Sequence, residues 1–416
     1  MARNKGSMDI AKKEMLVVGD LVTPTGFSRV LHSLIKHWQD EYNVTGVGVN
    51  YHGDPHNYDF PVFPAFNGRS VYGENRVCDL LNSRHFDILF ILNDSWVVDR
   101  YLHFIKENVK KALPKIVVYF PVDSMEHDPD WYANFDIVSQ AVTYTKFGEW
   151  VVNDSVPTLN LKVIPHGVDT GIFHKTYKSR TDAKIKFFAP YIEKMGDLSK
   201  SFIVLNANRN QPRKKLDITM LGFAKFAKNK PSNVKLYMHC GVRDASIDVD
   251  KLATRYGIGE RLIISSAKVG VQNVPDARLN EIYNATDVGI NTGMGEGWGL
   301  PNVEHAVTGA IQLVPNHSAC RELFTGCGLI MNTHSDFMFD NSQTVGRLVS
   351  PDEVAQKLDY LYRNPEEREK LAQAGYEKFT SPEYSWKQIA QNWKELFKGL
   401  LTNDTGNVSY EYSKPN

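Results

Sequence analysis

The stretch that decides the fold runs from Gly293 to Glu304 and has the sequence G-M-G-E-G-W-G-L-P-N-V-E. The apolar run before it, Asp287–Asn291, predicts a short buried strand that ends in this glycine-rich turn. Pro301 suits the first turn of a helix, because its missing N–H group costs nothing there. A strand, a glycine turn and a helix in this order are typical of a parallel α/β sheet.

The same stretch has the chemistry of an anion site. Backbone amides from Trp298 to Asn302 would lie free at the start of the helix, at the positive end of its dipole, where phosphate is the usual occupant. Two carboxylates, Glu296 and Glu304, flank the loop. A carboxylate is unfavourable beside a phosphate unless it binds hydroxyl groups, which sugars supply. The ligand predicted by this pattern is a phosphorylated sugar or a nucleotide.

A resemblance to a known family rests on these glutamates. Glu296 and Glu304 are separated by seven residues, within G-E-G-W-G-L-P-N-V-E-H-A-V-T-G. This pattern resembles the E-x7-E signature of the retaining, nucleotide-sugar-dependent glycosyltransferases of family four, which have the GT-B fold. The resemblance implies an α/β protein with two Rossmann-like, doubly wound domains that face a central cleft. The alternative is an acidic loop before an ordinary helix.

The resemblance also implies roles for the residues of the loop. Glu304 would bind the ribose hydroxyls of the donor, and Glu296 would contact the transferred sugar as a catalytic residue. Four consecutive residues would hold the donor diphosphate through their amides: Gly297, Trp298, Gly299 and Leu300.

Length and composition set the outer limits. A chain of 416 residues predicts two domains, and 42% hydrophobic residues can fill large cores. Lysine and arginine number 48, as do aspartate and glutamate, so no general field attracts nucleic acid. A polar, basic start, the lack of a transmembrane-length apolar run and four scattered cysteines predict a cytoplasmic protein with free thiols. Attachment to the periphery of a membrane stays open.

The N-terminal half begins with a predicted strand over Met15–Asp20, a turn that contains Gly26, and a helix from Phe27 to Trp38 with one apolar face. Further apolar runs predict four more parallel strands: Val44–Val49, Ile88–Leu92, Lys115–Phe120 and Ala141–Thr145. No G-x-G-x-x-G motif follows the first strand. In the resembled family this first loop approaches the donor diphosphate, which makes Gly26 a donor-binding candidate; a simple turn glycine is the alternative.

Three more candidates come from the first half. Ligands of open α/β sheets bind at the carboxyl ends of strands, which directs attention to the segment from Pro121 to Asp128. Many members of the family have a histidine near here, whereas this chain has Asp123, followed by His127. Asp123 could orient an acceptor hydroxyl or cap a turn, and His127 could contact the acceptor or be solvated. His166 lies in a "P-x-G-V-D" segment and could line the cleft or serve a structural role.

The second half begins with a predicted strand over Ser201–Asn206. Arg209 and Lys214, which follow it five residues apart, resemble the family's "G-R-x4-K-G" clamp for the diphosphate, although Lys215 replaces the usual glycine. Fixed cations would stabilise the charge that grows on a departing nucleoside diphosphate, so both are candidate catalytic and donor-binding residues. A solvated basic loop is the alternative. The segment Lys268 to Gly270 is the expected contact with the nucleobase.

The last part of the chain is predicted to be helical. Ser350, Asn364 and Ser385 each precede a Glu or Gln by three residues, which is the pattern of a helix cap. The final helix has an apolar stripe that fits packing on the first domain better than binding a membrane surface. The expected domains are residues 14–172 on the acceptor side and 201–383 on the donor side, with a crossing helix over 384–401. Residues 173–200 are expected to form a linker, which could carry an appended helix or hairpin.

These observations predict an enzyme that moves a hexose from a UDP- or GDP-linked donor to an acceptor hydroxyl of a glycan, lipid or other glycoconjugate. Retention of the anomeric configuration and independence from metal ions follow from the resemblance, and no cofactor is expected. Two alternatives stay open, namely a nucleotide-sugar epimerase of the same fold and a catalytically silent nucleotide-sugar-binding subunit. The oligomeric state is not predicted.

Overall fold

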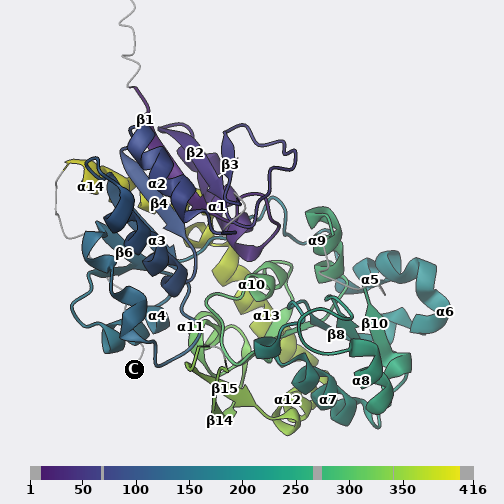
Figure 1. Ribbon diagram of the computed structural model, residues 1–416. Helices are drawn as coiled ribbons and strands as arrows, with labels where there is room; N and C mark the ends of the chain where they lie inside the picture. The colour runs from purple at the N-terminus through teal and green to yellow at the C-terminus, as the bar shows by residue number, and fades with distance from the viewer. Residues whose placement is uncertain (1–10, 67–69, 266–273, 341, 403–416) are drawn as a thin grey trace, which may run out of the picture.

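The computed structural model describes residues 11–66, 70–265, 274–340 and 342–402, and two parallel sheets organise this part of the chain (Figure 1). The first sheet has the order β3-β2-β1-β4-β5-β6-β7. Its strands are β1 Lys13–Gly19, β2 Tyr42–Gly48, β3 Val62–Pro64, β4 Ile88–Leu92, β5 Lys115–Phe120, β6 Gln140–Thr143 and β7 Leu161–Val163. Every neighbouring pair is parallel, so the chain must cross over between strands, and helices make most of the crossings.

Helices cover both faces of this sheet. The helices are α1 Gly26–Trp38, α2 Glu74–Ser83, α3 Ser95–Asn108 and α4 Lys146–Ser155. One face packs against α1, and the other packs against α2, α3 and α4. Burial on both faces explains why strands such as Ile88–Leu92 are apolar at every position.

The second sheet repeats this design with the order β10-β9-β8-β11-β12-β13, again all parallel. Its strands are β8 Phe202–Asn206, β9 Val234–Met238, β10 Leu262–Ile264, β11 Val288–Ile290, β12 Ile311–Pro315 and β13 Leu329–Met331. The helices between them are α7 Leu216–Ala227, α8 Val249–Arg255, α9 Asp276–Asn284, α10 Leu300–Ala306 and α11 Ser318–Phe324. The predicted fold class, two doubly wound α/β sheets, is therefore confirmed.

The linker is helical, which is one of the alternatives for it, and a hairpin that was not anticipated from the sequence follows the second sheet. Between the two sheets the chain forms α5 Arg180–Phe188 and the short α6 Ile192–Met195. After β13 it forms an antiparallel hairpin of β14 Thr333–Met338 and β15 Val345–Val349. β14 is mostly exposed, so it lacks the alternation of buried and exposed residues that would have predicted it.

The C-terminal helices are α12 Pro351–Arg363, α13 Pro365–Thr380 and α14 Trp386–Thr402. Ser350 caps α12 as predicted, since its hydroxyl accepts from the Glu353 amide at 3.1 Å. Ser385 likewise accepts from the Gln388 amide at 3.2 Å. Asn364 occupies the N-cap position of α13 as predicted, but its side chain makes no cap bond: it donates back to the Tyr360 carbonyl, because Asn364 also ends α12.

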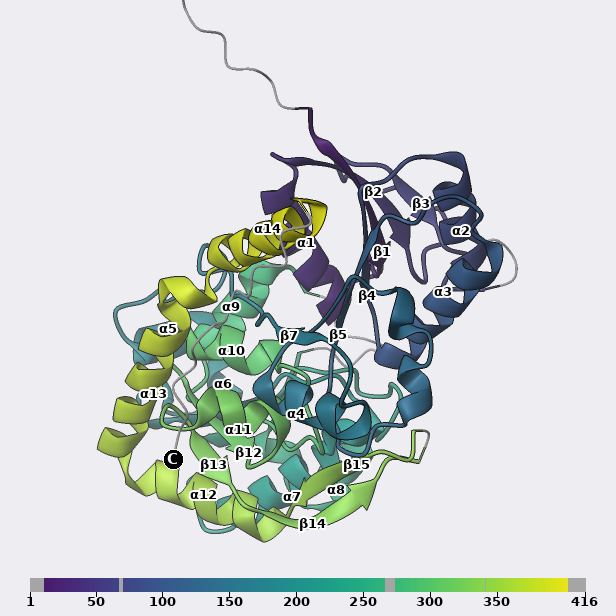
Figure 2. The same cartoon turned by 90° about the vertical axis from the view of Figure 1, so that its left-hand side faces the viewer.

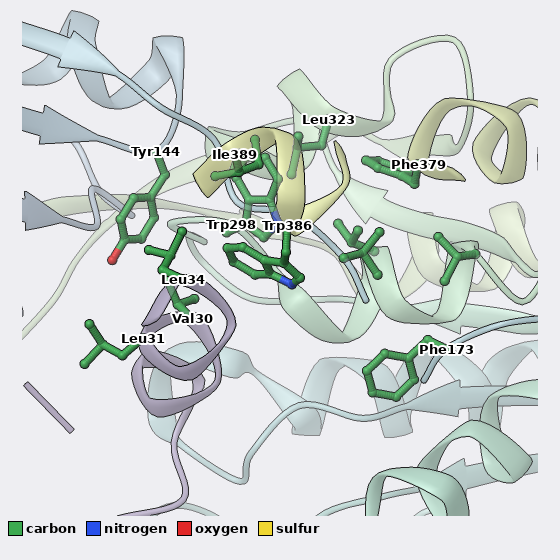
Figure 3. Packing of buried hydrophobic residues seen from close by; sticks show 14 of the residues in the cluster. Val30, Leu31, Leu34, Tyr144, Phe173, Trp298, Leu323, Phe379, Trp386 and Ile389 are labelled. Atoms are coloured by element: carbon green, nitrogen blue, oxygen red, sulfur yellow. The ribbon is translucent and has the colours of Figure 1, made fainter. Parts of the chain in front are cut away.

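Helix α14 returns to the first sheet and packs beside α1 (Figure 2). The ring of Trp393 lies 5.1 Å from that of Phe90 and 4.8 Å from that of Tyr119, centroid to centroid. Lys394 adds an ion pair to Asp40 at 2.6 Å. One buried cluster thus runs from α1 through α14 into α10 and α11, and we call it the shared core (Figure 3).

The carboxyl ends of the two sheets meet. A Cβ atom on Gly295, which follows β11, would lie only 1.7 Å from the Asp123 carbonyl oxygen, which follows β5. The hairpin joins the same regions through its main chain: the Met125 amide donates to the Val345 carbonyl at 2.7 Å, and the Val345 amide donates back at 3.0 Å. In each sheet the strand order reverses once, between β1 and β4 and between β8 and β11, and ligands of such folds bind at these reversals.

Candidate active site

The glycine-rich loop between β11 and α10 forms the floor of the site. Gly299 has a φ of 89°, a left-handed conformation that glycine adopts freely, and it starts α10. Gly295 and Gly297 have no room for a side chain, because Asp123 and Pro121 of the first sheet press against them. Within the described part of the chain, the amides of Gly297, Trp298 and Gly299 donate no hydrogen bond, although the loop is buried. Buried amides without acceptors are favourable for an anion.

Two cations approach this loop from the turn after β8. Lys214, only 8% exposed, contacts the Glu296 carboxylate through its ammonium group. Arg213 donates to the Gly295 carbonyl at 3.0 Å, and its Nη1 lies 3.2 Å from Asp123 Oδ2. Burial and the neighbouring Arg213 hold the pKa of Lys214 below its ordinary value. Lysine and arginine charges are therefore concentrated beside the free amides.

Glu296 stays ionised in this setting. Burial alone would raise the pKa of its carboxyl, but Lys214 and Arg213 together lower it. The Asn291 amide group also donates to Glu296 Oε1 at 2.9 Å, and the Glu296 amide donates to Ser318 Oγ at 2.9 Å. Glu296 is thus held from several sides at the junction of the two sheets.

Arg209 does not join this group. It forms a two-pronged ion pair with Asp244, at 2.8 and 3.2 Å, and its side chain is 46% exposed. The reason lies in the neighbouring Asn210, which is buried and donates to the carbonyls of Gly241 and Ile247. These bonds hold the loop against the segment after β9, so the arginine that approaches Glu296, at 4.0 Å, is Arg213. Sequence reasoning missed Arg213, although it is adjacent to Lys214.

Glu304 lies in α10, where it is 4% exposed. Tyr283 of α9 donates its hydroxyl to Glu304 Oε2 at 2.9 Å, and Arg29 Nε of α1 lies 3.4 Å from Oε1. Burial raises the pKa of Glu304 to about 7, despite the opposing effects of Arg29 and Tyr283. Arg29 also pairs with Asp276 at 2.6 Å, so its charge is shared between two carboxylates.

Gly26 lies close to the loop, as the resemblance implies. A Cβ atom on it would be 3.4 Å from a methyl group of Leu300. The preceding Thr25 caps α1 by accepting from the Ser28 amide, and its own hydroxyl donates to Asp20 at 2.7 Å. The first loop is thereby fixed against the start of α10.

Three carboxyl groups follow the strands β1, β4 and β5 of the first sheet: Asp20, Asp94 and Asp123. Asp123 is paired with Arg213, as described above. Burial, and then the like charge of Asp123, raise the pKa of Asp94 to about 6. Burial also raises the pKa of Asp20. Sequence reasoning missed Asp20 and Asp94, although Asp20 is the last residue of one predicted strand and Asp94 comes two residues after another, where the strand order reverses.

The two candidate histidines are buried and have aromatic partners. His127 shares a hydrogen bond of 2.7 Å with the Tyr132 hydroxyl, and burial lowers its pKa to about 4. His166 shares one of 2.8 Å with the Tyr119 hydroxyl, and burial lowers its pKa to about 3. Neither forms a hydrogen bond or ion pair with Glu296, Lys214 or Glu304 within the described residues.

His166 packs against the side chain of Trp298, which belongs to the glycine-rich loop. Its ring lies 5.3 Å from that of Trp298, 4.0 Å from that of Tyr144 and 5.9 Å from that of Trp386. Figure 3 shows Trp298 and Trp386 next to each other in the shared core. The side chain of Trp298 therefore anchors the loop in the core and leaves its backbone for binding.

Two further findings concern the described part of the chain. It contains no group of three His, Cys, Asp or Glu residues that could hold a metal ion, and none of its helices has the length and hydropathy to cross a bilayer. The nucleobase contact expected at Lys268 to Gly270 falls outside the described residues.

Comparison with known proteins agrees with this geometry. Residues 249–395, which include the glycine-rich loop, match a family model described as "Glycosyl transferase-like". No curated protein matches the sequence at a significant level.

Solved structures show the fold. Sucrose-phosphate synthase from Thermosynechococcus elongatus has a TM-score of 0.74 at 13% identity, over 95% of this chain and 100% of its own. HepE from Anabaena, solved with UDP and glucose, has a TM-score of 0.68 at 14% identity, over 93% and 100%. The catalytic domain of starch synthase IV from Arabidopsis thaliana, bound to ADP and acarbose, has 0.66 at 12%, over 94% and 100%. The fold is the GT-B fold of glycosyltransferases, as the resemblance implied.

Proposed function

We propose that this protein is a glycosyltransferase that moves a hexose from a UDP- or GDP-linked donor to a hydroxyl of a glycan, lipid or other glycoconjugate. The observation that carries the proposal is the meeting of Arg213, Lys214 and the free amides of residues 297–299 at the junction of the two sheets. A nucleoside diphosphate has the negative charge that these groups can bind and the ribose hydroxyls that Glu304 can accept from. Solved proteins of this fold contain UDP, UDP-glucose or ADP, which supports the same ligand class.

Charge governs the proposed reaction. As the bond from the anomeric carbon to the diphosphate breaks, negative charge grows on the leaving group, and fixed cations and amides stabilise it without reorganising. Lys214 and Arg213 supply that charge, so the proposal includes no metal ion. Glu296 accepts hydrogen bonds from hydroxyls of the transferred sugar and orients its ring. Its contact with Lys214 holds the carboxylate ionised for that purpose.

Glu304 takes the ribose in this proposal. Its carboxyl is buried beside the loop and is shared between Tyr283 and Arg29. Vicinal hydroxyls of a ribose can donate to one carboxylate through both oxygens, which would replace the contact with Arg29. Because Arg29 belongs to α1, donor binding at Glu304 would also be sensed by the first sheet.

The acceptor would approach from the first sheet. Asp123 lies across the junction from Lys214 and orients the acceptor hydroxyl, with Asp94 and Asp20 beside it as further hydrogen-bond acceptors. Retention of the anomeric configuration is part of the proposal and rests on the resemblance to family four. The bond from the anomeric carbon to the diphosphate oxygen breaks as the new bond forms to the acceptor oxygen, and the proton of the acceptor hydroxyl passes to the oxygen of the departing diphosphate.

The test has two steps. Thermal shift with UDP, GDP and ADP should show stabilisation by one diphosphate, weakened in Glu304→Gln and unchanged in Glu395→Gln, an exposed glutamate of α14. Sugars linked to that nucleotide are then incubated with and without acceptor sugars, in the presence of EDTA. Release of nucleotide that requires the acceptor supports transfer. Isomerised donor without an acceptor would identify an epimerase, and binding without turnover would identify a silent subunit.

A further inference from the structure

A cavity lies at the amino ends of the strands of the second sheet, on the other side of that sheet's length from the candidate active site. Its volume is about 350 Å³, and it is lined by residues that precede the strands, namely Ser201 before β8, Asp287 before β11 and Gly309 before β12. The candidate active site follows the carboxyl ends of the same strands. Because β8 has five residues and a strand rises about 3.3 Å per residue, roughly 15 Å of sheet separates the two places.

The cavity has an excess of positive charge. Its charged lining consists of four cations and two carboxylates: Arg180, Lys184, Lys200, Arg368, Asp287 and Glu369. Lys184 is 4% exposed and pairs with Asp287 at 2.7 Å, so these two charges cancel. The remaining cations outnumber Glu369 by two, and this excess faces a space large enough for a small molecule.

Arg180 is the most informative of these cations. Its guanidinium donates to four backbone carbonyls around the start of β11 and the end of α10: those of Tyr283, Asn284, Thr286 and Thr308, at 3.1, 3.2, 2.6 and 3.0 Å. No carboxylate forms an ion pair with it within the described residues. The carbonyl groups fix the side chain without neutralising its charge, on which the carboxylates of Asp287 and Glu369 act only from beyond ion-pair distance.

Arg368 and Lys200 supply charge that is free to meet a ligand. Arg368 lies over the ring of Phe202 at 5.4 Å and donates to the Leu361 carbonyl at 3.0 Å. Lys200 is 81% exposed and has only a loose pair with Asp197, at 3.7 Å. Burial lowers the pKa of Arg180; the carboxylates of Asp287 and Glu369 oppose this effect, and the like charge of Arg368 adds to it.

We propose that this cavity binds a small phosphorylated metabolite, a phosphate monoester whose phosphate lies among Arg180, Lys200 and Arg368. A phosphate monoester carries close to two negative charges at neutral pH, which equals the excess of cations. The hydroxyls of Thr181 and Ser199 line the same space, and Tyr362 provides a wall for the organic part. The volume lies within the range of about 300–1,000 Å³ that is usual for small-molecule sites. This site is independent of the proposed transferase activity.

Glucose 6-phosphate, inorganic phosphate and neutral glucose serve as probes in titration calorimetry with the full chain. We expect both phosphates to bind and glucose not to bind. Lys200→Glu should weaken binding of glucose 6-phosphate by about tenfold or more, since it removes one charge-assisted contact and adds a repulsive charge. Lys251→Glu is a matched control, because Lys251 is also 81% exposed and also pairs loosely with an aspartate, at 4.0 Å.

Two further variants make the outcome decisive. Arg368→Gln should weaken binding by a similar factor through a second lining residue, with circular dichroism to confirm folding. Lys214→Ala, in the candidate active site, should leave glucose 6-phosphate binding unchanged. The proposal is overturned if glucose 6-phosphate does not bind, if both lining variants bind it as tightly as Lys251→Glu does, or if Lys214→Ala abolishes its binding.

Discussion

The facing edges of the two sheets, formed by the carboxyl ends of their strands, have the same architecture but carry different charged groups. The first sheet ends in the carboxyl groups of Asp20, Asp94 and Asp123, whereas the second combines Glu296 and Glu304 with two cations, Arg213 and Lys214, and a loop of free amides. Both edges are carboxyl ends of parallel strands at a reversal of strand order, so the fold alone does not distinguish them. The side chains do: one edge suits an anion, and the other suits hydroxyl groups. The two similar sheets thus provide two binding surfaces, and their charged side chains decide which class of ligand each surface suits.

The largest expected effect comes from removing a cation from the carboxyl edge of the second sheet. Lys214→Ala combined with Glu296→Gln removes the cation without leaving a buried carboxylate unpaired. We expect turnover to fall by at least about 10²–10³-fold, which is the usual loss for one group that stabilises a developing charge. Steady-state kinetics with the identified donor measures it. Lys225→Ala, which changes a half-exposed lysine of α7, is the control, and near-normal turnover of the double variant would refute the role of Lys214.

The second prediction concerns a substitution that would force the carboxyl edges of the two sheets apart. In Gly295→Ala the new methyl group would collide with the Asp123 carbonyl, so the loop and the β5 segment must move apart. Since a displacement of about 1 Å can cost roughly 10²-fold in rate, we expect a loss of that order in kcat. Gly259→Ala is the matched control, because a Cβ atom there meets nothing within 4 Å. Equal rates for the two variants would mean that close contact of the edges is not needed.

The third prediction concerns Glu304, an acid at the carboxyl edge of the second sheet that contacts Arg29 of α1. Its folded-state pKa of about 7 exceeds the ordinary 4.5, so the folded protein binds the proton more tightly and loses stability as the pH rises from 5 to 8. Glu304→Gln removes the titrating carboxyl group, so this loss of stability with rising pH does not occur in the variant. Relative to wild type, its unfolding free energy should therefore gain about 2 kcal/mol between pH 5 and pH 8.

Denaturant midpoints at several pH values check this prediction. Glu383→Gln, which changes an exposed glutamate, should follow wild type. Parallel curves for wild type and Glu304→Gln would show that Glu304 is fully ionised in the folded protein.

The smallest expected effect tests whether Asp123, at the carboxyl edge of the first sheet, contacts the acceptor. Asp123→Asn keeps the shape but removes the charge opposite Arg213. We expect a rise of about tenfold in the KM for the acceptor, since a hydrogen bond to a charged group is worth about 1.5–3 kcal/mol. The KM for the donor should change less. Kinetics with each substrate varied in turn distinguishes the two, and a larger change for the donor would move Asp123 to the other role.

Much of the fold could be predicted from the sequence, because local signals encode it. Apolar runs such as Ile88–Leu92 gave strands, and the stripe of Phe27 to Trp38 gave a helix. The hairpin of β14 and β15 could not be predicted, since its first strand is mostly exposed and its position depends on contacts with Met125 and Met294, far away in the chain.

The site was predictable to the extent that it is local. Glu296, Glu304 and the loop between them lie within one stretch, and the structure brings both glutamates beside it. Lys214 was predictable by spacing, but the arginine near Glu296 was not, because Asn210 is bound to Gly241 and Ile247, which turns Arg209 toward Asp244 and leaves the position to Arg213. Asp94 was missed because its environment depends on a neighbouring strand.

The two main-chain hydrogen bonds between Met125 and Val345 have a consequence for how the protein can change over evolutionary time. Both hydrogen bonds come from the main chain, so they survive replacement of either side chain by any residue that keeps its N–H group. Proline is the exception, since it has none. An attachment between the two halves of the molecule can thus persist while the amino acids that form it drift freely. Sequence conservation would not reveal it.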